Sequence, residues 1–247
     1  MTQEASPALK ANTTQTHAKV WDIPTRLFHW SLLGVFVFQF VTGDILDDAM
    51  QLHFYGGYVA LGLILFRIIW GFVGSYHARF SSFIYSPSTA LQYLMGRPKL
   101  QQYLGHNPLG AYSVLAILAV MLTQAVSGLF MTDDIFLDGP YHGAFDGALD
   151  DAMNWLHHNA ISLMWGLIVL HLSAIAFYSF KKKQRLVPAM LHGKKPVSHS
   201  QTSDTPADLN VVTHWWRFLI VVAVVAVFVY CLVNVFAPEP EMGLYDY

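Results

Sequence analysis

Residues 154–180 read NWLHHNAISLMWGLIVLHLSAIAFYSF, a run that is long and apolar enough to cross a lipid bilayer. A helix needs about 20 apolar residues to span a hydrocarbon core of about 30 Å. This run nevertheless contains three histidines, and ionisable residues within a spanning helix usually face a functional site inside a bundle because they are costly there. A plainer interpretation is one buried, hydrogen-bonded histidine with two others at the headgroup level. The stretch therefore predicts a membrane helix that bears a polar site.

The composition of the whole chain indicates a membrane protein. Of its 247 residues, 54% are hydrophobic and only 12% are charged, which is far from the balance of a soluble domain. The first apolar run ends at VTGD rather than at a small-residue cleavage motif, so we expect an uncleaved anchor. The sequence predicts an all-α membrane protein with five transmembrane helices in contact with lipid. The runs long enough to span lie near residues 27–43, 52–74, 109–131, 156–180 and 215–237.

Several kinds of functional site are missing from the sequence. The single cysteine, Cys231, cannot form an intrachain disulfide, and without a CxxCH motif the chain cannot attach a haem covalently. There is no glycine-rich phosphate loop and no cysteine or carboxylate cluster with the spacing of a metal cage. No residue has the setting of a catalytic acid, base or nucleophile, and we expect no nucleic-acid partner. Any haem must therefore be held by ligation and packing.

The charged residues separate onto two sides of the membrane once the five spans alternate in direction. All 14 Lys and Arg lie on one side, either in segments 1–26, 75–108 and 181–214 or, for Arg67 and Arg217, at helix ends beside them. The positive-inside rule makes this side cytoplasmic, so we expect the N-terminus inside and the C-terminus outside. Most of the 16 acids lie on the other side, namely Asp44, Asp47, Asp48, Asp133, Asp134, Asp138, Asp146, Asp150, Asp151, Glu239, Glu241 and Asp246.

The acids make the outer side strongly negative although the whole chain has a formal net charge of only −2. One interpretation is a docking surface that steers a basic periplasmic redox protein by charge complementarity. The other is topology alone, with acids tolerated wherever positive charge is excluded. Acids contribute little to orientation, so the sequence leaves both interpretations open.

The remaining segments lie outside the spans. The polar N-terminus is expected to be disordered, and the stretch after the fourth span is rich in Pro, Ser and charge, which is typical of a flexible linker. SPSTALQYLMG, residues 86–96, has the start and end signals of a short interfacial helix. The expected organisation is a cytoplasmic N-terminus (1–18), a four-helix core (19–180), a basic cytoplasmic linker (181–212), a fifth helix (213–237) and a periplasmic acidic tail (238–247).

Helix geometry sorts the three histidines of the opening stretch. His157 and His171 are 14 residues apart, so they share a face and lie about 21 Å apart along the helix axis. His158 points about 140° away from His171. Two histidines on one face near opposite membrane surfaces suit two stacked cofactors. A haem iron with two axial imidazoles would need a second histidine from another helix in each case.

Second ligands are available at both levels. His53 begins the second span just after the outer acids, and His29 lies in the first turns of the first span near its cytoplasmic end. The inner pair is therefore His29 with His171, and the outer pair is His53 with His157. When depth is counted from the outer acids by helical rise, His29 and His171 differ in depth by about 7 Å. The fourth helix must start above the outer surface, or tilt, to absorb this difference.

Arg67 and several glycines have two interpretations each. Arg67 lies 14 residues beyond His53 and so either binds a haem propionate at the inner level or extends to the inner surface. His106 either caps the third span or contacts a quinone. The glycines allow either porphyrin edges or neighbouring helices to approach closely; they are Gly56, Gly57, Gly62, Gly110 and Gly128.

Four motifs together resemble the bacterial cytochrome b561 family, which includes the b-type cytochrome subunits of nickel-iron hydrogenases. They are VWDIPTRLFHWSLL, LHFYGGYVALGLILFRIIWGFVGSYHARFSSF, YLGHNPLGAYSVL and the pairing of LHH with LIVLH, and they cover residues 19–180. The resemblance implies a four-helix transmembrane bundle that holds two non-covalent b haems. The family's axial ligands correspond to His29, His53, His157 and His171, in agreement with the helix geometry. The fifth helix and the tail EPEMGLYDY exceed this core.

The resemblance also implies a function: respiratory electron transfer across the bacterial inner membrane between the quinone pool and a periplasmic redox partner. That partner would be a c-type cytochrome or a hydrogenase-like enzyme, and the chain could be a hydrogenase-type membrane anchor and electron-transfer subunit. Any chemistry beyond electron transfer would rest on the quinone site. A proton-coupled transporter would use intramembrane histidines as relays, but the five runs contain no Asp or Glu.

Overall fold

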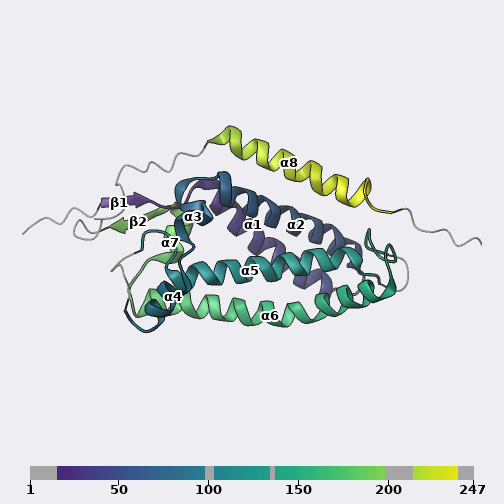
Figure 1. The fold of residues 1–247 in the computed structure, drawn as a ribbon, viewed down its shortest axis with the longest axis horizontal. Coiled ribbons are helices and arrows are strands. Elements are labelled where there is room, and N and C mark those ends of the chain that lie inside the picture. The colour runs from purple at the N-terminus through teal and green to yellow at the C-terminus, as the bar shows by residue number, and fades with distance from the viewer. Residues whose placement is uncertain (1–15, 98–102, 134–136, 198–213, 239–247) are drawn as a thin grey trace, which may run out of the picture.

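Five long helices form the body of the protein in the computed structural model, which describes residues 16–97, 103–133, 137–197 and 214–238. All five are long and apolar enough to cross a membrane, so the predicted all-α membrane fold is confirmed. In Figure 1 they run nearly side by side along the long axis. They are α1 (Ile23–Phe40, extended by the π turn η1, Val41–Ile45), α2 (Met50–Val73), α5 (Pro108–Ser127, extended by the 3-10 turn η3, Gly128–Phe130), α6 (Gly147–Phe180) and α8 (Trp215–Asn234).

The short elements gather at one end of the bundle. They include α4, which confirms the short helix expected over residues 86–96. Figure 1 shows the short helices and the two-stranded sheet beside the first residues of α1 and the last residues of α6. The elements are β1 (Thr16–Lys19), η2 (Tyr76–Ala78), α3 (Phe80–Phe83), α4 (Pro87–Leu94), α7 (Leu186–His192) and β2 (Lys194–Val197).

Side-chain caps fix where the spanning helices begin. The carboxylate of Asp22 accepts a hydrogen bond from the amide of Thr25 at 2.8 Å, and the Asn107 side chain accepts one from the amide of Gly110 at 2.7 Å. Proline in the first turn of α1 and α5 suits these starts because its missing N–H needs no partner there. Asn107, and not His106, therefore caps the third span.

The first four spans close into a bundle. Trp165 of α6 contacts α1, with its ring centroid 5.3 Å from that of Phe36 and 5.2 Å from that of Phe40. Gly56 brings α1 and α2 together, since a Cβ there would collide with the side chains of Gln39 and Phe38. Gly56 therefore serves helix packing, one of the two interpretations open from sequence.

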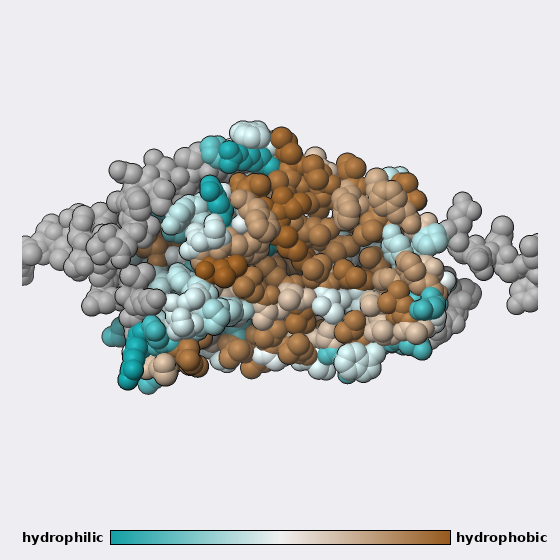
Figure 2. Space-filling model, viewed as in Figure 1, coloured by the Kyte–Doolittle hydropathy of each residue, from teal (hydrophilic) through white to brown (hydrophobic). Residues whose placement is uncertain are grey.

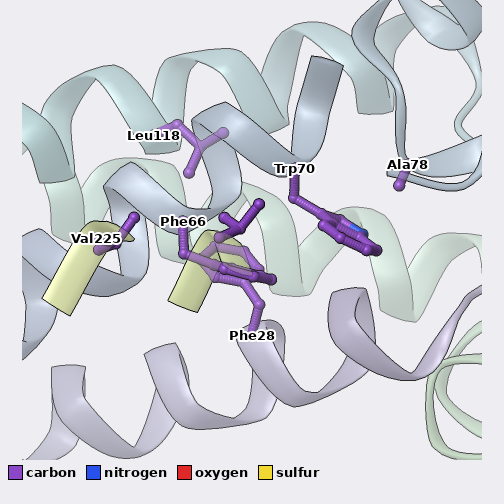
Figure 3. Packing of buried hydrophobic residues seen from close by; sticks show 7 residues of the cluster. Phe28, Phe66, Trp70, Ala78, Leu118 and Val225 are labelled. Carbon is purple, nitrogen blue, oxygen red and sulfur yellow. The ribbon is translucent and has the colours of Figure 1, made fainter. Parts of the chain in front are cut away.

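The fifth span packs against α2. Figure 3 shows Phe28 of α1, Phe66 and Trp70 of α2 and Val225 of α8 meeting in one buried cluster. A Cβ at Gly62 would lie 3.8 Å from Val225, so this glycine also lies at a helix contact. The fifth helix therefore joins the core through α2.

The surface of the bundle is that of a membrane protein. Figure 2 shows hydrophobic residues over the middle of the molecule and more hydrophilic ones towards both ends. On α6, large apolar side chains such as Leu163 and Val169 are more than half exposed. Such exposure is expected for helices whose outer faces contact lipid rather than water.

The fourth span is longer than the bilayer requires. Helix α6 has 34 residues, about 51 Å at the rise of an α-helix, and begins at Gly147, ten residues before His157. The helix is thus longer than the roughly 30 Å of a hydrocarbon core. A long fourth helix is one of the two ways in which the sequence allowed the difference in depth between His29 and His171 to be absorbed.

The segment expected to be a linker, 181–212, contains regular structure in its described part. Helix α7 is followed by strand β2, which pairs antiparallel with β1 from Thr16↔Val197 to Lys19↔Lys194. Gly193 turns the chain between them with a φ of +78°, and its carbonyl accepts hydrogen bonds from the amides of Val20 and Trp21. The described residues exclude 1–15, 198–213 and 239–247. Most of the expected N-terminal segment (1–18) and acidic tail (238–247) therefore lies outside them.

Candidate functional site

The outer pair of histidines faces one another inside the bundle. His53 lies in the first turn of α2 and His157 in the third turn of α6, and their ring centroids are 6.3 Å apart with the planes at 85°. Metal–imidazole bonds are about 2 Å long, so two imidazoles on opposite sides of one ion have nitrogens about 4 Å apart and ring centroids about 6 Å apart. The spacing of His53 and His157 therefore suits a single metal ion between them.

Backbone carbonyls fix the tautomer of both rings. The Nδ1 of His53 lies 3.1 Å from the Gln39 carbonyl oxygen, and the Nδ1 of His157 lies 3.0 Å from that of Gln124 and 3.1 Å from the Ser127 hydroxyl. A carbonyl oxygen only accepts, so each Nδ1 must donate a hydrogen. The lone pair is then on Nε2, the arrangement in which a second partner orients a metal-binding imidazole.

Glycines make room for both rings. A Cβ at Gly43 would lie 2.8 Å from Cε1 of His53, and one at Gly128 would lie 3.1 Å from Cε1 of His157. Any larger residue at Gly43 would force the imidazole to move. Gly128 thus serves the histidine site itself, whereas Gly56 and Gly62 lie at helix contacts.

A cavity opens beside the two imidazoles. It is lined mainly by apolar side chains from α1, α2, α5 and α6, including Phe40, Met121 and Met164, together with His53 and His157. His158 lies at its rim, where its ring is exposed and its Nδ1 bonds to the carbonyl of Asn154 on its own helix at 2.9 Å. Of the adjacent histidines, His157 therefore enters the bundle interior and His158 does not.

The inner pair expected from sequence is His29 of α1 and His171 of α6. Both residues are half-buried, and His171 lies within electrostatic range of His29. The Nδ1 of His29 is buried and has no hydrogen-bond partner among the described residues. Buried ring nitrogens are normally satisfied, so this atom marks a place where a further group would fit.

A group of buried polar residues that the sequence did not predict lies at the end of the bundle that contains the β-sheet. His106 lies between Trp21 and Phe83, at ring-centroid distances of 4.7 and 4.6 Å. Arg67 is 3% exposed and lies over the ring of Phe80 at 5.1 Å. The sequence left His106 as a cap of the third span or a quinone contact, but Trp21 and Phe83 from distant segments enclose it.

Burial controls the protonation of the loop histidines in this group. It lowers the pKa of His106 to about 3, with smaller contributions in the same direction from Arg67 and Lys195. The pKa of His77 is also lowered, first by burial and then by Lys195. Both imidazoles are thus held neutral, so the buried positive charge at this end belongs to Arg67 and Lys195.

The residues present fit a haem better than a protein-only metal site. The described residues contain no group of three or more His, Cys, Asp or Glu side chains that could hold a metal ion. Two opposed imidazoles provide only the axial positions, and a haem macrocycle occupies the others. The apolar cavity and the close approach at Gly43 and Gly128 are consistent with such a group.

Comparisons with known proteins point the same way. A sequence model of the family described as prokaryotic cytochrome b561 matches residues 20–193. A probable Ni/Fe-hydrogenase B-type cytochrome subunit of Azotobacter chroococcum mcd 1 is 24% identical, covering 72% of this chain and 88% of its own length. Proteins with the same description from Bradyrhizobium diazoefficiens (24% identical, 71% and 85% covered) and Rhizobium leguminosarum bv. viciae (20%, 71% and 87%) are also similar. No solved structure matches significantly.

The lowered pKa of His106 predicts that acid destabilises the segments that enclose this residue. Its folded-state pKa of about 3 lies below the ordinary 6.5, so the unfolded chain binds the extra proton between these values and stability falls as the pH drops through that range. The apparent unfolding temperature, followed by tryptophan fluorescence, should decrease from about pH 7.5 to about pH 5. His106→Phe should flatten this dependence, whereas His192→Gln, at an exposed position on α7, should not. An equal pH dependence in wild type and His106→Phe would contradict the assignment.

Proposed function

The chain belongs to the prokaryotic cytochrome b561 family, and on this premise we propose that it binds two b haems and transfers electrons across the bacterial inner membrane between the quinone pool and a periplasmic redox partner. Membership and the five candidate spans make it a multi-pass membrane b-type cytochrome of electron transport. The observation that best supports the finer proposal is the opposed pair His53 and His157 at 6.3 Å.

In the proposed outer site, His53 and His157 are the axial ligands. Their Nδ1 hydrogens are held by the carbonyls of Gln39 and Gln124, which keeps Nε2 directed at the metal position and raises its basicity. The haem, when bound, supplies reversible one-electron exchange at its iron. Neutral imidazoles bring no charge of their own into the hydrocarbon, which lowers the cost of burying the site.

In the proposed inner site, His29 and His171 are the ligands and Arg67 binds a propionate. Helix α6 supplies one ligand to each site, because His157 and His171 share a face. A haem carries its propionates as carboxylates, and the buried guanidinium of Arg67 has an unpartnered Nη1 among the described residues. Arginine is suited to buried carboxylate recognition because its charge is delocalised over a planar fork of donors.

The proposed orientation follows the charges. The described basic residues outside α2 and α8 lie at the end that contains the β-sheet, and Asp44, Asp47 and Asp48 lie at the other end. The positive-inside rule then puts the N-terminus in the cytoplasm and the C-terminus in the periplasm. The proposed divisions are those expected from sequence: the core over 19–180, a cytoplasmic segment over 181–212 and the fifth helix over 213–237.

Two kinds of periplasmic partner fit this proposal. The relatives are described as hydrogenase cytochrome subunits, which supports a hydrogenase-like enzyme. The family match ends at residue 193, before α8, and this extra helix favours a different partner such as a c-type cytochrome. Both would dock at the acidic face near the outer site.

The histidine assignments predict that the two haems can be lost separately. His53→Ala and His157→Ala should each remove the outer haem, and His29→Ala and His171→Ala the inner one, because each haem needs both of its axial ligands. His158→Ala should retain both haems and serves as the control beside His157. Haem-to-protein ratio and potentiometric titration of the purified variants measure this. Equal losses in His157→Ala and His158→Ala would be inconsistent with the scheme.

The close approach at Gly43 gives a second test of the outer site. Gly43→Ala should displace the His53 ring, whose Cε1 would be 2.8 Å from the new Cβ, and so lower the occupancy of the outer haem. Gly34→Ala is the matched control, because nothing lies within 4 Å of a Cβ there and both positions belong to the first span. Full haem content and unchanged spectra in Gly43→Ala would show that the ring has no fixed position.

Docking at the acidic face predicts a salt-dependent rate of electron exchange. Asp47, Asp48 and Asp151 are exposed, and changing all three to Asn should slow exchange with a basic c-type cytochrome at low salt while haem content stays intact. Salt should slow the wild type similarly, since the Debye length falls to about 8 Å at physiological ionic strength. Asp208→Asn, on the predicted cytoplasmic side, is the control. Stopped-flow rates that respond to neither salt nor the triple change would contradict docking and leave topology alone as the explanation of the acidic face.

A further inference from the structure

Strand β2 buries a lysine at the cytoplasmic end of the bundle. Lys195 is 6% exposed, whereas the preceding Lys194 is exposed. The Lys195 Nζ donates hydrogen bonds to the carbonyl oxygens of Tyr103 at 3.1 Å and Leu104 at 3.2 Å. An ammonium has three donors, so these two carbonyls hold the head group in place and leave one N–H for another acceptor.

The buried charges at this end do not balance. Arg67 is 3% exposed, and no described carboxylate lies within ion-pair distance of Lys195 or Arg67. Asp22 is the one described acid that acts on Arg67 electrostatically, and its two oxygens already accept hydrogen bonds from the Thr25 amide and the Trp70 indole. Burying an uncompensated charge is unfavourable, so the pair of cations calls for an anion.

The two cations lie beside the same buried residue, His106. The Arg67 guanidinium is 5.8 Å from the ring centroid of Phe83, which is 4.6 Å from that of His106, and Lys195 binds the carbonyls of Tyr103 and Leu104 just before His106. His171 of the inner pair acts on His106 electrostatically. Burial lowers the pKa of Lys195 to about 8, and a bound anion would favour its charged form again. The anion that the family's cofactor brings to this depth is the carboxylate of a haem propionate.

We propose that Lys195 binds a propionate of the inner haem together with Arg67, so that the segment Leu186–Val197 closes the cytoplasmic side of that haem. This assignment rests on the di-haem function proposed above. The ammonium acts as a point charge while the guanidinium supplies directed donors. Because Lys195 belongs to the β1–β2 sheet, haem binding and the folding of this cap support one another. A lipid phosphate is the other anion with this chemistry, and the experiment separates the two.

The experiment compares Lys195→Met, Lys195→Arg and the control Lys194→Met in the purified, haem-loaded full chain in nanodiscs. Removing a positive charge near a haem disfavours its reduced, more negative state. Lys195→Met should therefore lower the reduced-to-oxidised ratio of the inner haem about tenfold at a fixed potential, which is about 59 mV for a one-electron couple. The outer haem should not change, haem content should stay at two, and Lys195→Arg should restore the wild-type potential.

Each other outcome has a defined meaning. An inner potential unchanged in Lys195→Met, or shifted equally in Lys195→Arg, would overturn the assignment. A shift seen in phosphatidylglycerol nanodiscs but absent in zwitterionic phosphatidylcholine nanodiscs would assign the lysine to the phosphate of a net-anionic lipid instead and also overturn it. A wild type with a single haem would refute the di-haem function as well, which distinguishes that failure from failure of the Lys195 assignment alone.

Discussion

Lipid offers no hydrogen bonds, so each polar group placed within the hydrocarbon must find its partner inside the protein. The outer histidines show what this constraint produces. Each Nδ1 hydrogen is taken by a carbonyl of a neighbouring helix, from Gln39 for His53 and Gln124 for His157. A carbonyl can accept more than one hydrogen bond, so the helices that supply these carbonyls can keep their own backbone hydrogen bonds. The same contact that satisfies the ring also fixes its tautomer and leaves Nε2 available to a metal.

The constraint acts differently at the end of the bundle that contains the β-sheet, where charged groups are enclosed together with neutral rings. Asp22 caps α1 and accepts the Trp70 indole hydrogen at 3.0 Å, which ties the start of the first span to the end of the second. Both residues are 1% exposed. Arg67 lies one turn before Trp70 on α2, so the anchor between the helices also positions a buried guanidinium. Packing and charge placement are thus two results of one local arrangement.

Features that depend on local sequence were predictable, and those that depend on distant pairing were not. The spans follow from apolar length, and the helix starts at Asp22 and Asn107 have the expected polar residue before a proline-containing first turn. The sharing of one helix face by His157 and His171 follows from helical rotation alone. The β1–β2 sheet joins residues about 180 positions apart. Strands of four residues contain too little pattern to predict which distant segment pairs with them. Lys195 lies in that sheet, and His106 is enclosed by Trp21 and Phe83 from distant segments, so neither could be recognised as buried from its polar surroundings in the sequence.

The position of the fifth helix explains how the chain can exceed the family core without disturbing it. Helix α8 contacts α2 through Val221, Val225 and Phe218, while the outer histidines face the space enclosed by α1, α2, α5 and α6. At the far end of the bundle from the β-sheet, the Tyr141 hydroxyl donates to the carbonyl of Leu232 at 2.9 Å, which joins the end of α8 to the loop before α6. A helix added at this place can therefore change the surface at this end of the bundle while leaving the cavity beside His53 and His157 as it is.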